Sequence, residues 1–595
     1  MKKISIVFIA LLALLHTACK DALDLYPETD LSDISMWKNA GDFEKGVNKF
    51  YEWLPKIMDN NDASVAENTR YGIADRDKLA DIVIDNGSLN NISNSTYNIP
   101  ATDPYYEGYY KRLRAINYVF KNAEGYAKPE EIKQYLAEAK FFRAYYSFLF
   151  FADFGPGTIV KNVLETDAPE LSSARNTRDE FADFIIADLE SAIADLPTQA
   201  TLPAAQNGRI SKGTAQSMLA RVALFEGTWQ KYHLTNVTRA NTLLDKAIAN
   251  SEAVMNDASY QLFYDARMGA ESYRWMFVLE SSLQTNPYKL TKAVNKEYIF
   301  RNRFDENIRV SNQNVVHTMP GAGVTASRKM QEMYLTAEGK IAVPDYKTSL
   351  NSFLKNRDPR LADNHRAVLD LYWEYALGRG DWAGGKVDSL RASVRSYDGV
   401  GFFNKKFASE RLFTNATLDG MDVPIIRLAE IYLTYAEAKF EKNGSVTNAE
   451  LDLSINKLRT RVQMPALTNA TIPAGSDMKT EIRRERTVEL WLEGHRYNDL
   501  RRWKTAETEM SQDLDGLPFM GGSAYLRTAS VFVPKDNKTV TYTNTYTTNK
   551  GVVNAAGFAL REAGSGRKFS AKHYLKPIPS KQIEINPNLK QNEGW

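Results

Sequence analysis

The spacing of apolar residues constrains the fold more than any other feature of the chain. They recur at a helical period in residues 41–58, 105–123, 132–151, 179–196, 212–230 and 239–255, and again in 425–441, 448–461 and 478–503. The sequence therefore predicts a mainly α protein made of helical hairpins. Small and aromatic residues at close intervals, as in Ala429, Tyr432, Tyr435 and Ala436, are typical of tetratricopeptide-like packing, in which small side chains let paired helices approach.

Length and charge narrow the class of protein. With 595 residues and 43% hydrophobic content, the chain can bury a large core. The 75 lysines and arginines nearly balance the 73 aspartates and glutamates, so a net charge of +2 gives no overall field to attract nucleic acid. After Leu15 no apolar stretch approaches the roughly 20 residues that a membrane-spanning helix needs. We expect neither a nucleic-acid partner nor a spanning helix.

The N-terminus has the layout of a bacterial lipoprotein signal. Two lysines precede an apolar run over residues 4–15, which has the length of a secretory signal. Cys19 follows two small residues and is the only cysteine, so no second thiol exists with which it can pair. We predict a signal peptide over residues 1–18, lipidation of Cys19 and a tether over residues 19–35. A plain signal peptide with an incidental cysteine is the alternative.

Two segments lack a clear helical spacing. Residues 261–413 contain clustered glycines and scattered aromatic residues, and function usually lies in such loops. Residues 511–573 contain an alternating run from Thr539, which predicts a small exposed β-hairpin. We expect one domain over residues 36–595, divided into a helical scaffold (36–260 and 414–505), an irregular ligand-region insert (261–413), a small β insertion (511–573) and a C-terminal segment (574–595).

Short motifs are spread over nearly the whole chain. They lie in residues 106–117, 137–146, 154–156, 208–213, 220–222, 333–340, 356–361, 427–438, 481–503, 577–579 and 586–592. The most specific is residues 481–503. In combination these motifs resemble those of the SusD/RagB family of outer-membrane nutrient-binding lipoproteins of Bacteroidetes. The chain departs from the family pattern at Tyr106, where tryptophan is common, and in its last three residues.

The resemblance implies a fold, a location and a partner. Such proteins have a helical scaffold with tetratricopeptide-like pairs, cap a SusC-like TonB-dependent barrel and deliver glycan fragments to it. We therefore expect a lipid-anchored protein of the outer membrane, facing the cell exterior, that captures oligosaccharides for such a transporter. Lys20 and Asp21, directly after Cys19, partly resemble the acidic tag that sends these lipoproteins to the cell surface.

No residue pattern indicates catalysis, a cofactor or a metal site. Glu485 and Glu489 lie one helical turn apart, a separation that resembles that of the carboxylates of a retaining glycosidase. A catalytic pair needs unlike pKa values, whereas Arg483, Arg484 and Arg486 are expected to hold both carboxylates ionised. We expect a packed ionic network that pins neighbouring helices. The six histidines show no metal-ligand spacing.

Sugar recognition requires flat aromatic faces for the apolar patches of the sugar ring and fixed polar groups for its hydroxyls. Two regions offer them, the loop before the second helix and the irregular insert. The candidate ligand-binding residues are Tyr71, Asp75, Arg76, Tyr97, Tyr288, Tyr298, Trp373 and Trp382. For any one ring, packing in the core is the alternative. Trp275 is expected to be a buried strand residue, and residues 357–360 a fold-defining turn.

Other functions remain open for the same residues. The same fold can take peptides or host glycoprotein-derived ligands, and a deep polar pocket in place of an aromatic platform favours these. An all-helical glycoside hydrolase also binds sugars through aromatic rings, and it predicts release of reducing ends. A purely structural scaffold predicts copurification with a barrel and no ligand.

Overall fold

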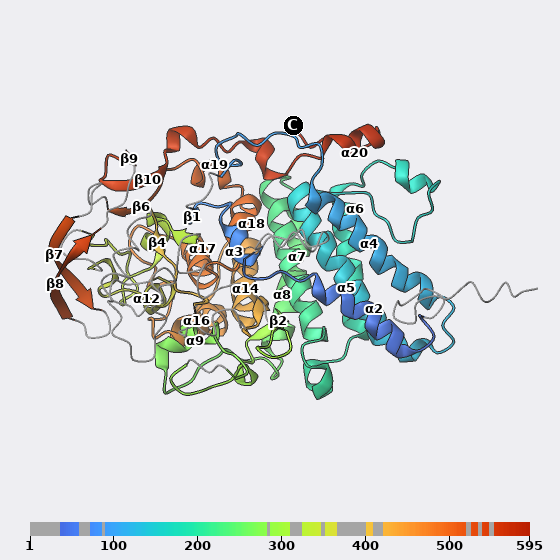
Figure 1. The fold of residues 1–595 in the computed structure, drawn as a ribbon, viewed down its shortest axis with the longest axis horizontal. Helices are drawn as coiled ribbons and strands as arrows, with labels where there is room; N and C mark the ends of the chain where they lie inside the picture. The colour runs from blue at the N-terminus through green and yellow to red at the C-terminus, as the bar shows by residue number, and fades with distance from the viewer. Residues whose placement is uncertain are drawn as a thin grey trace, which may run out of the picture.

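Long helices packed side by side form one half of the molecule, on the right of Figure 1. They are α2 (Ala40–Glu52), α4 (Pro104–Ala123), α5 (Pro129–Phe154), α6 (Arg178–Asp195), α7 (Lys212–Tyr232) and α8 (Val237–Met255). The computed structural model describes residues 36–58, 72–85, 90–282, 286–309, 324–346, 352–365, 400–408, 420–518, 525–533, 538–546 and 552–595. Over these residues the fold is mainly α with tetratricopeptide-like pairs, which confirms the sequence prediction.

Local sequence explains where these helices begin and end. The Asp103 carboxylate accepts hydrogen bonds from the backbone N–H groups of Tyr105 (2.8 Å) and Tyr106 (3.2 Å), and so caps α4. From α4 to α8 the bounds agree with the expected ranges to within three residues. Helix α2 ends at Glu52, earlier than the expected residue 58, because Pro55 cannot continue a helix and disfavours helical backbone before it.

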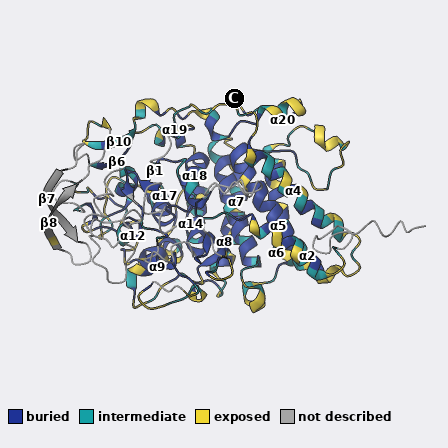
Figure 2. Ribbon diagram, viewed as in Figure 1, coloured by how far each residue is buried: buried dark blue, intermediate teal, exposed yellow. Residues whose placement is uncertain are grey.

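A second group of elements, in the centre of Figure 1, comes from the late part of the chain. It consists of β5 (Val423–Arg427), α14 (Leu428–Asn443), α15 (Asn448–Leu453), α16 (Ile455–Arg461), α17 (Met478–Glu489) and α18 (Arg496–Arg502). Helix α14 packs against both α8 and α17 and so joins the two groups. Figure 2 shows the helices at this junction largely buried.

All three helices expected in the late part of the chain differ from the prediction. The first begins as strand β5, which pairs with β2 (Tyr298–Asn302). The helix expected over residues 448–461 breaks at Ser454, whose φ of −131° and ψ of −96° are not helical. The helix expected over residues 478–503 stops at the end of α17 and resumes at α18. Between them φ is positive at Leu492 (57°) and at Gly494 (79°).

The break between α17 and α18 is set by a contact from the other end of the chain. The Asp77 carboxylate, at the end of α3 (Ile73–Asp77), accepts hydrogen bonds from the N–H groups of Gly494 and Arg496, each at 3.1 Å. A Cβ at position 494 would lie 2.7 Å from the Ile73 carbonyl oxygen. Glycine is therefore needed here both for the positive φ and for the close approach of the two backbones.

Small antiparallel sheets and short helices complete the fold. The strand orders are β1 (Val83–Asp85)–β3 (Val324–Ala326)–β4 (Phe402–Phe403), β2–β5, β6 (Leu514–Pro518)–β10 (Phe558–Glu562)–β9 (Val552–Val553), and β7 (Tyr525–Val533)–β8 (Lys538–Tyr546). The β7–β8 pair confirms the expected hairpin, with Tyr525 opposite Tyr546 and Val533 opposite Lys538. The short helices are α9 (Ser272–Met276), α11 (Arg328–Met333), α12 (Pro359–Asn364), α19 (Ala506–Glu509) and α20 (Ser580–Ile585).

Single 3-10 turns connect many of these elements. They are Pro169–Ser172, Gln199–Thr201, Ala204–Gln206, Gly269–Glu271, Lys292–Val294, Ser352–Leu354, Gly564–Gly566 and Ala571–Tyr574. Trp275 is buried, as expected, but it lies in α9 and not in a strand, because a short apolar run does not by itself distinguish the two. None of the helices in the described part of the chain is both long enough and apolar enough to span a bilayer.

Glu489 lies at the centre of a buried ionic network. Its carboxylate accepts hydrogen bonds from Arg360 (2.9 Å), Arg427 (2.7 Å) and Arg461, which come from α12, the end of β5 and α16. Burial raises the pKa of Glu489, but the charges of Arg461, Arg427 and Arg360 outweigh it and hold the pKa well below its usual range. The network thus confirms the expected ionised pair and ties α17 to three other elements.

The partners in this network differ from those expected. Glu485 bonds to Arg360 (2.6 Å) and Arg459 (2.9 Å), which come from other helices. The arginines of α17 itself pair elsewhere: Arg483 with Glu441, Arg484 with Glu481 and Arg486 with Asp499. Adjacent residues of a helix point in different directions, so Arg484 and Arg486 do not face the Glu485 carboxylate, which takes its partners from the helices packed against α17.

Residues 357–360 form a fold-defining turn, as predicted. Asp358 caps α12 by accepting a hydrogen bond from the N–H of Arg360 at 3.0 Å. The Arg357 guanidinium donates to the carbonyl oxygens of Gln331 (2.6 Å) and Tyr334 (2.7 Å). The turn therefore fastens α12 to the end of α11.

His365 makes the stability of this region depend on pH. Its side chain is fully buried, with Nε2 3.2 Å from the Tyr334 hydroxyl oxygen, and burial together with Lys406 lowers its pKa to about 3. An unfolded histidine has a pKa of about 6.5. As pH falls from about 6.5 towards 3, the unfolded state gains a proton that the native state does not bind. His365 therefore lowers stability by up to about 1.4 kcal/mol per pH unit in this window.

Replacing His365 with glutamine should flatten this dependence. Glutamine keeps polar atoms near Tyr334 but takes up no proton. Between pH 6 and pH 4 we expect the unfolding free energy of the wild type to fall by about 1.4 kcal/mol per pH unit relative to that of His365→Gln. Guanidinium unfolding at pH 7, 5 and 4 measures it. A difference that stays constant over this range contradicts a neutral buried histidine.

Candidate functional site

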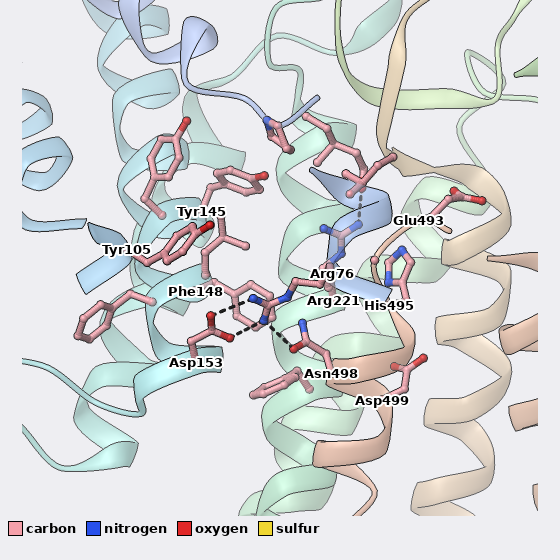
Figure 3. Close-up of a pocket in the computed structure, with 18 of the residues that line it drawn as sticks. Arg76, Tyr105, Tyr145, Phe148, Asp153, Arg221, Glu493, His495, Asn498 and Asp499 are labelled. Atoms are coloured by element: carbon pink, nitrogen blue, oxygen red, sulfur yellow. Dashed lines mark hydrogen bonds and ion pairs between the residues drawn. The ribbon is translucent and has the colours of Figure 1, made fainter. Parts of the chain in front are cut away.

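A cavity of about 170 Å³ lies between α5 on one side and α3, α7, α17 and α18 on the other (Figure 3). We call it the central cavity. Its wall on the α4–α5 side is aromatic and includes Tyr105, Tyr145 and Phe148. Leu149, the next residue on α5, also lines it and is 41% exposed, so it marks the side open to solvent. The central cavity therefore combines flat apolar faces with a route to the surface.

A polar bridge crosses the central cavity from α3 to α5 and α18. The Arg76 guanidinium donates to both Asp153 oxygens, at 2.9 Å to Oδ2, and to Asn498 Oδ1 at 3.1 Å (Figure 3). Arg501 (3.3 Å) and Lys576 (3.4 Å) also pair with Asp153. Burial raises the pKa of Asp153, but Arg76, Lys576 and Arg501 together lower it far below its usual range. Asp153 is thus a fixed negative charge that holds three segments together.

Arg486, His495 and Thr434 also line the central cavity, and we call these three largely buried residues its deep end. Arg486 donates through Nε to Asp499 (2.8 Å) and through Nη2 to His495 Nδ1 (3.3 Å). In the described part of the protein its Nη1 has no hydrogen-bond partner, and neither has the hydroxyl of Thr434. Both side chains line the cavity. His495 is neutral, because burial, Arg486 and Arg221 lower its pKa well below the usual range.

Tyr288 lies on a different, solvent-exposed surface. It is 39% exposed, its hydroxyl donates to the backbone oxygen of Arg267 at 2.9 Å, and the Arg267 guanidinium lies 4.4 Å from its ring centre. Asp265 holds this guanidinium through two hydrogen bonds of 2.9 and 2.6 Å. Tyr264, close by in sequence, is 51% exposed. We call these four residues the Tyr288 surface; it offers exposed rings beside a carboxylate and a guanidinium.

The other sequence-predicted residues do not converge on one site. Arg76 lines the central cavity, whereas Asp75 pairs with Lys78 at 2.8 Å, because adjacent residues of a helix point in different directions. Tyr97 is half-buried against Trp595, with ring centres 5.9 Å apart. Tyr298 is 6% exposed in β2 and its hydroxyl lies 3.4 Å from the Met276 oxygen, so its ring presents no open face.

Several predictions fall outside the described residues. These are Tyr71, Trp373 and Trp382 among the ligand candidates, the lipidation site Cys19, and the signal and tether over residues 1–35. Among the residues that are described, no group of three or more His, Cys, Asp or Glu side chains is placed to hold a metal ion.

Sequence reasoning missed most of the central cavity. Phe148 and Asp153 belong to a helix that is apolar around most of its circumference, which is typical of a buried helix. Asp153 stands between Ala152 and Phe154 in that helix, and a charge in such surroundings indicates a buried ion pair. No comparable signal marks Thr434, which lies on a helix of ordinary composition.

Comparisons with known proteins assign most of the chain to one group. The model described as "SusD family" matches residues 284–595, and the model described as "Starch-binding associating with outer membrane" matches residues 23–224. A SusD-like protein of Formosa agariphila is 22% identical over 523 residues, 87% of this chain and 94% of that protein.

Two further relatives add sequence and fold similarity. The starch-binding protein SusD of Bacteroides thetaiotaomicron is 28% identical over 182 residues, which span 31% of this chain and only 23% of that protein's length. The crystal structure of a SusD-like carbohydrate binding protein from Bacteroides fragilis has a TM-score of 0.64 at 22% identity. It covers 93% of this chain and 99% of its own. At this identity the similarity establishes the fold.

Proposed function

Because this chain belongs to the SusD family, we propose that it is a glycan-binding lipoprotein of the outer membrane that delivers oligosaccharides to a SusC-like TonB-dependent transporter. It is held by an acylated Cys19 and a tether over residues 19–35, faces the cell exterior, and forms one domain over residues 36–595. Its role is capture: a glycan stacks on exposed rings, the protein closes over the barrel, and the transporter supplies the energy of import.

The observation that carries this proposal is the family match over residues 284–595, which includes Tyr288. The starch-binding relative and the family description that associates such proteins with the outer membrane support the ligand class and the location. The Tyr288 surface supports it physically. An exposed ring covers the apolar face of a sugar, while Asp265 and Arg267 accept from and donate to its hydroxyls.

The state of the carboxylates supports binding without catalysis. A retaining glycosidase needs one protonated and one ionised carboxyl group on either side of the scissile bond. Glu485 and Glu489 are both ionised, because arginines lower the pKa of each despite burial, and both are engaged in the core. They therefore serve to hold the fold together.

Replacing Tyr288 with alanine is expected to weaken glycan binding about threefold to tenfold. This corresponds to the roughly 0.5–1.5 kcal/mol that an aromatic contact contributes beyond area burial. Affinity electrophoresis of the purified protein in gels containing starch, laminarin or acidic polysaccharides measures the retardation. Tyr288→Phe is the matched control: it keeps the ring and loses only the hydroxyl bond to Arg267, so it should bind nearly as the wild type.

The same panel tests the proposed class of function. We expect at least one polysaccharide to retain the protein without release of reducing ends. We also expect the full-length protein to copurify with a TonB-dependent barrel from detergent-solubilised membranes. Binding to peptides alone, or hydrolysis of the bound glycan, would replace this function by one of its alternatives.

A further inference from the structure

Two buried polar groups at the deep end of the central cavity lack a partner. Arg486 is 4% exposed and Thr434 is 1% exposed. Within the described structure, neither Nη1 of Arg486 nor Oγ1 of Thr434 makes a hydrogen bond. A buried donor left unsatisfied costs about 1–3 kcal/mol, and such groups are rare in native proteins. Since both side chains line a cavity, a molecule bound there can supply what they lack.

His495 adds a third donor to the lining of the central cavity. Arginine only donates, so the Nδ1 atom of His495 accepts from Arg486, and the neutral ring carries its hydrogen on Nε2. This Nε2 lies 3.9 Å from the nearest oxygen of Glu430, which is beyond hydrogen-bonding distance. The deep end thus presents N–H groups from Arg486 and His495 and the hydroxyl of Thr434.

The neighbouring carboxylates are already engaged. Glu430 accepts from Arg221 at 2.7 and 2.6 Å. Asp499 accepts from Arg486 at 2.8 Å and from Arg502 at 2.9 Å. Because these carboxylates already accept hydrogen bonds from arginines, further acceptors for Nη1 of Arg486, Nε2 of His495 and the Thr434 hydroxyl have to come from a bound molecule or from water.

The size and the opposite wall limit what that molecule can be. A volume of about 170 Å³ is below the roughly 300–1,000 Å³ of pockets that enclose drug-sized ligands, so the cavity takes about one sugar ring. Tyr105, Tyr145 and Phe148 face this space from the other side. Flat rings of this kind cover the apolar face of a pyranose.

The donors favour an acidic group over a neutral one. A carboxylate offers two oxygens and about four lone-pair sites, and its hydrogen bonds to arginine are about twice as strong as neutral ones. The described residues that line the cavity include five arginines and only three carboxylates. Two of these arginines are already neutralised from outside the lining, Arg221 by Glu430 and Arg502 by Glu437. The preference for a carboxylate therefore comes from the donors Arg486 and His495 and not from an excess of positive charge.

We propose that the central cavity binds a single carboxylate-bearing sugar ring, such as a uronic acid at the end of an acidic glycan. The ring packs against Tyr105, Tyr145 and Phe148, and its carboxylate accepts hydrogen bonds from Arg486 and His495, with Thr434 bonding a ring substituent or the carboxylate. This inference deepens the proposed glycan binding, because it names a ligand class and a second site apart from the Tyr288 surface.

Isothermal titration of the purified full-length protein with glucuronate and with glucose tests it. Glucuronate is expected to bind at one site, and glucose, which lacks the carboxylate, at least tenfold more weakly. Thr434→Val removes the hydroxyl while keeping the branched shape and should weaken glucuronate binding about threefold to tenfold. No heat with glucuronate up to millimolar concentrations, or equal binding of both sugars, would overturn the proposal and leave the cavity to water or to a neutral ring.

Two variants of opposite charge at the rim of the central cavity give a second test that does not disturb the core. Leu149 is exposed, so both Leu149→Glu and Leu149→Lys should fold. We expect Leu149→Lys to bind glucuronate at least threefold more tightly than Leu149→Glu. Leu453→Glu, which places the same charge on a 53% exposed position of α15, is the matched control and should bind as the wild type. Equal affinities of the two Leu149 variants would contradict binding in this cavity.

The experiments distinguish a failure of glycan capture at the Tyr288 surface from a failure of the cavity site. Retention on polysaccharide that depends on Tyr288, with no binding of glucuronate, rejects only the cavity site. Glucuronate binding that depends on Thr434, with no polysaccharide retained, rejects glycan capture at the Tyr288 surface and keeps the cavity site.

Discussion

Replacing Glu489 with glutamine is expected to lower the free energy of unfolding by about 3–5 kcal/mol. The substitution keeps the shape of the side chain and removes the one carboxylate that, among the described residues, pairs with all three of Arg360, Arg427 and Arg461. Each of these arginines is at most 1% exposed in its side chain. Water therefore cannot replace the lost carboxylate, and uncompensated buried positive charge remains.

Equilibrium unfolding in guanidinium chloride, followed by circular dichroism, measures this loss. Glu190→Gln is the matched control, since Glu190 pairs with Lys246 at the surface, where the side chains are 48% and 38% exposed. Exposed pairs contribute about 0–1 kcal/mol. Similar losses for the two variants would contradict a central role of Glu489.

Asp153→Asn is the second change with a large expected effect, about 3–5 kcal/mol. It leaves the positive charges of Arg76, Arg501 and Lys576 facing a neutral amide. Because Asp153 joins α5 to α3 and to α18, the variant is expected to loosen α3 as well as to lower overall stability. Hydrogen exchange of the backbone N–H groups of residues 73–78 reports the local effect, and guanidinium unfolding the global one.

A double-mutant cycle isolates the contribution of the bridge. Arg76→Met keeps the length of the side chain and removes its charge. If the two residues act through each other, the losses in Asp153→Asn and Arg76→Met are strongly non-additive. Asp183→Asn is the control, because Asp183 is 62% exposed and pairs with Arg239 at the surface. Additive losses at Asp153 and Arg76 would show that each residue acts through other partners.

The long helices could be predicted from the sequence because their signal is local. Helix α4, for example, begins at a proline behind a capping aspartate and repeats apolar residues at a helical period. The break after Glu489 could not be predicted in the same way. It depends on Asp77, which is 417 residues away from Gly494 and meets it only in the folded protein.

The candidate site was predictable only in part, for a related reason. Tyr288 and Tyr298 lie in the same irregular segment, yet the first is exposed and the second is buried by the pairing of β2 with β5. That pairing joins segments more than a hundred residues apart, and no local pattern records it. The donors Thr434, Arg486 and His495 likewise come from three segments that only tertiary packing brings together.

The contact between Asp77 and Gly494 can form only after the ribosome has synthesised the residues between them. A ribosome adds about 5–20 residues per second, so the 417 residues between these partners take on the order of 20–80 s to synthesise. During that interval Arg76 and Asp77 have no late helix to dock on. The early helices therefore lack this docking partner until the late part of the chain has been made, and a product truncated before Gly494 stays open at the same seam.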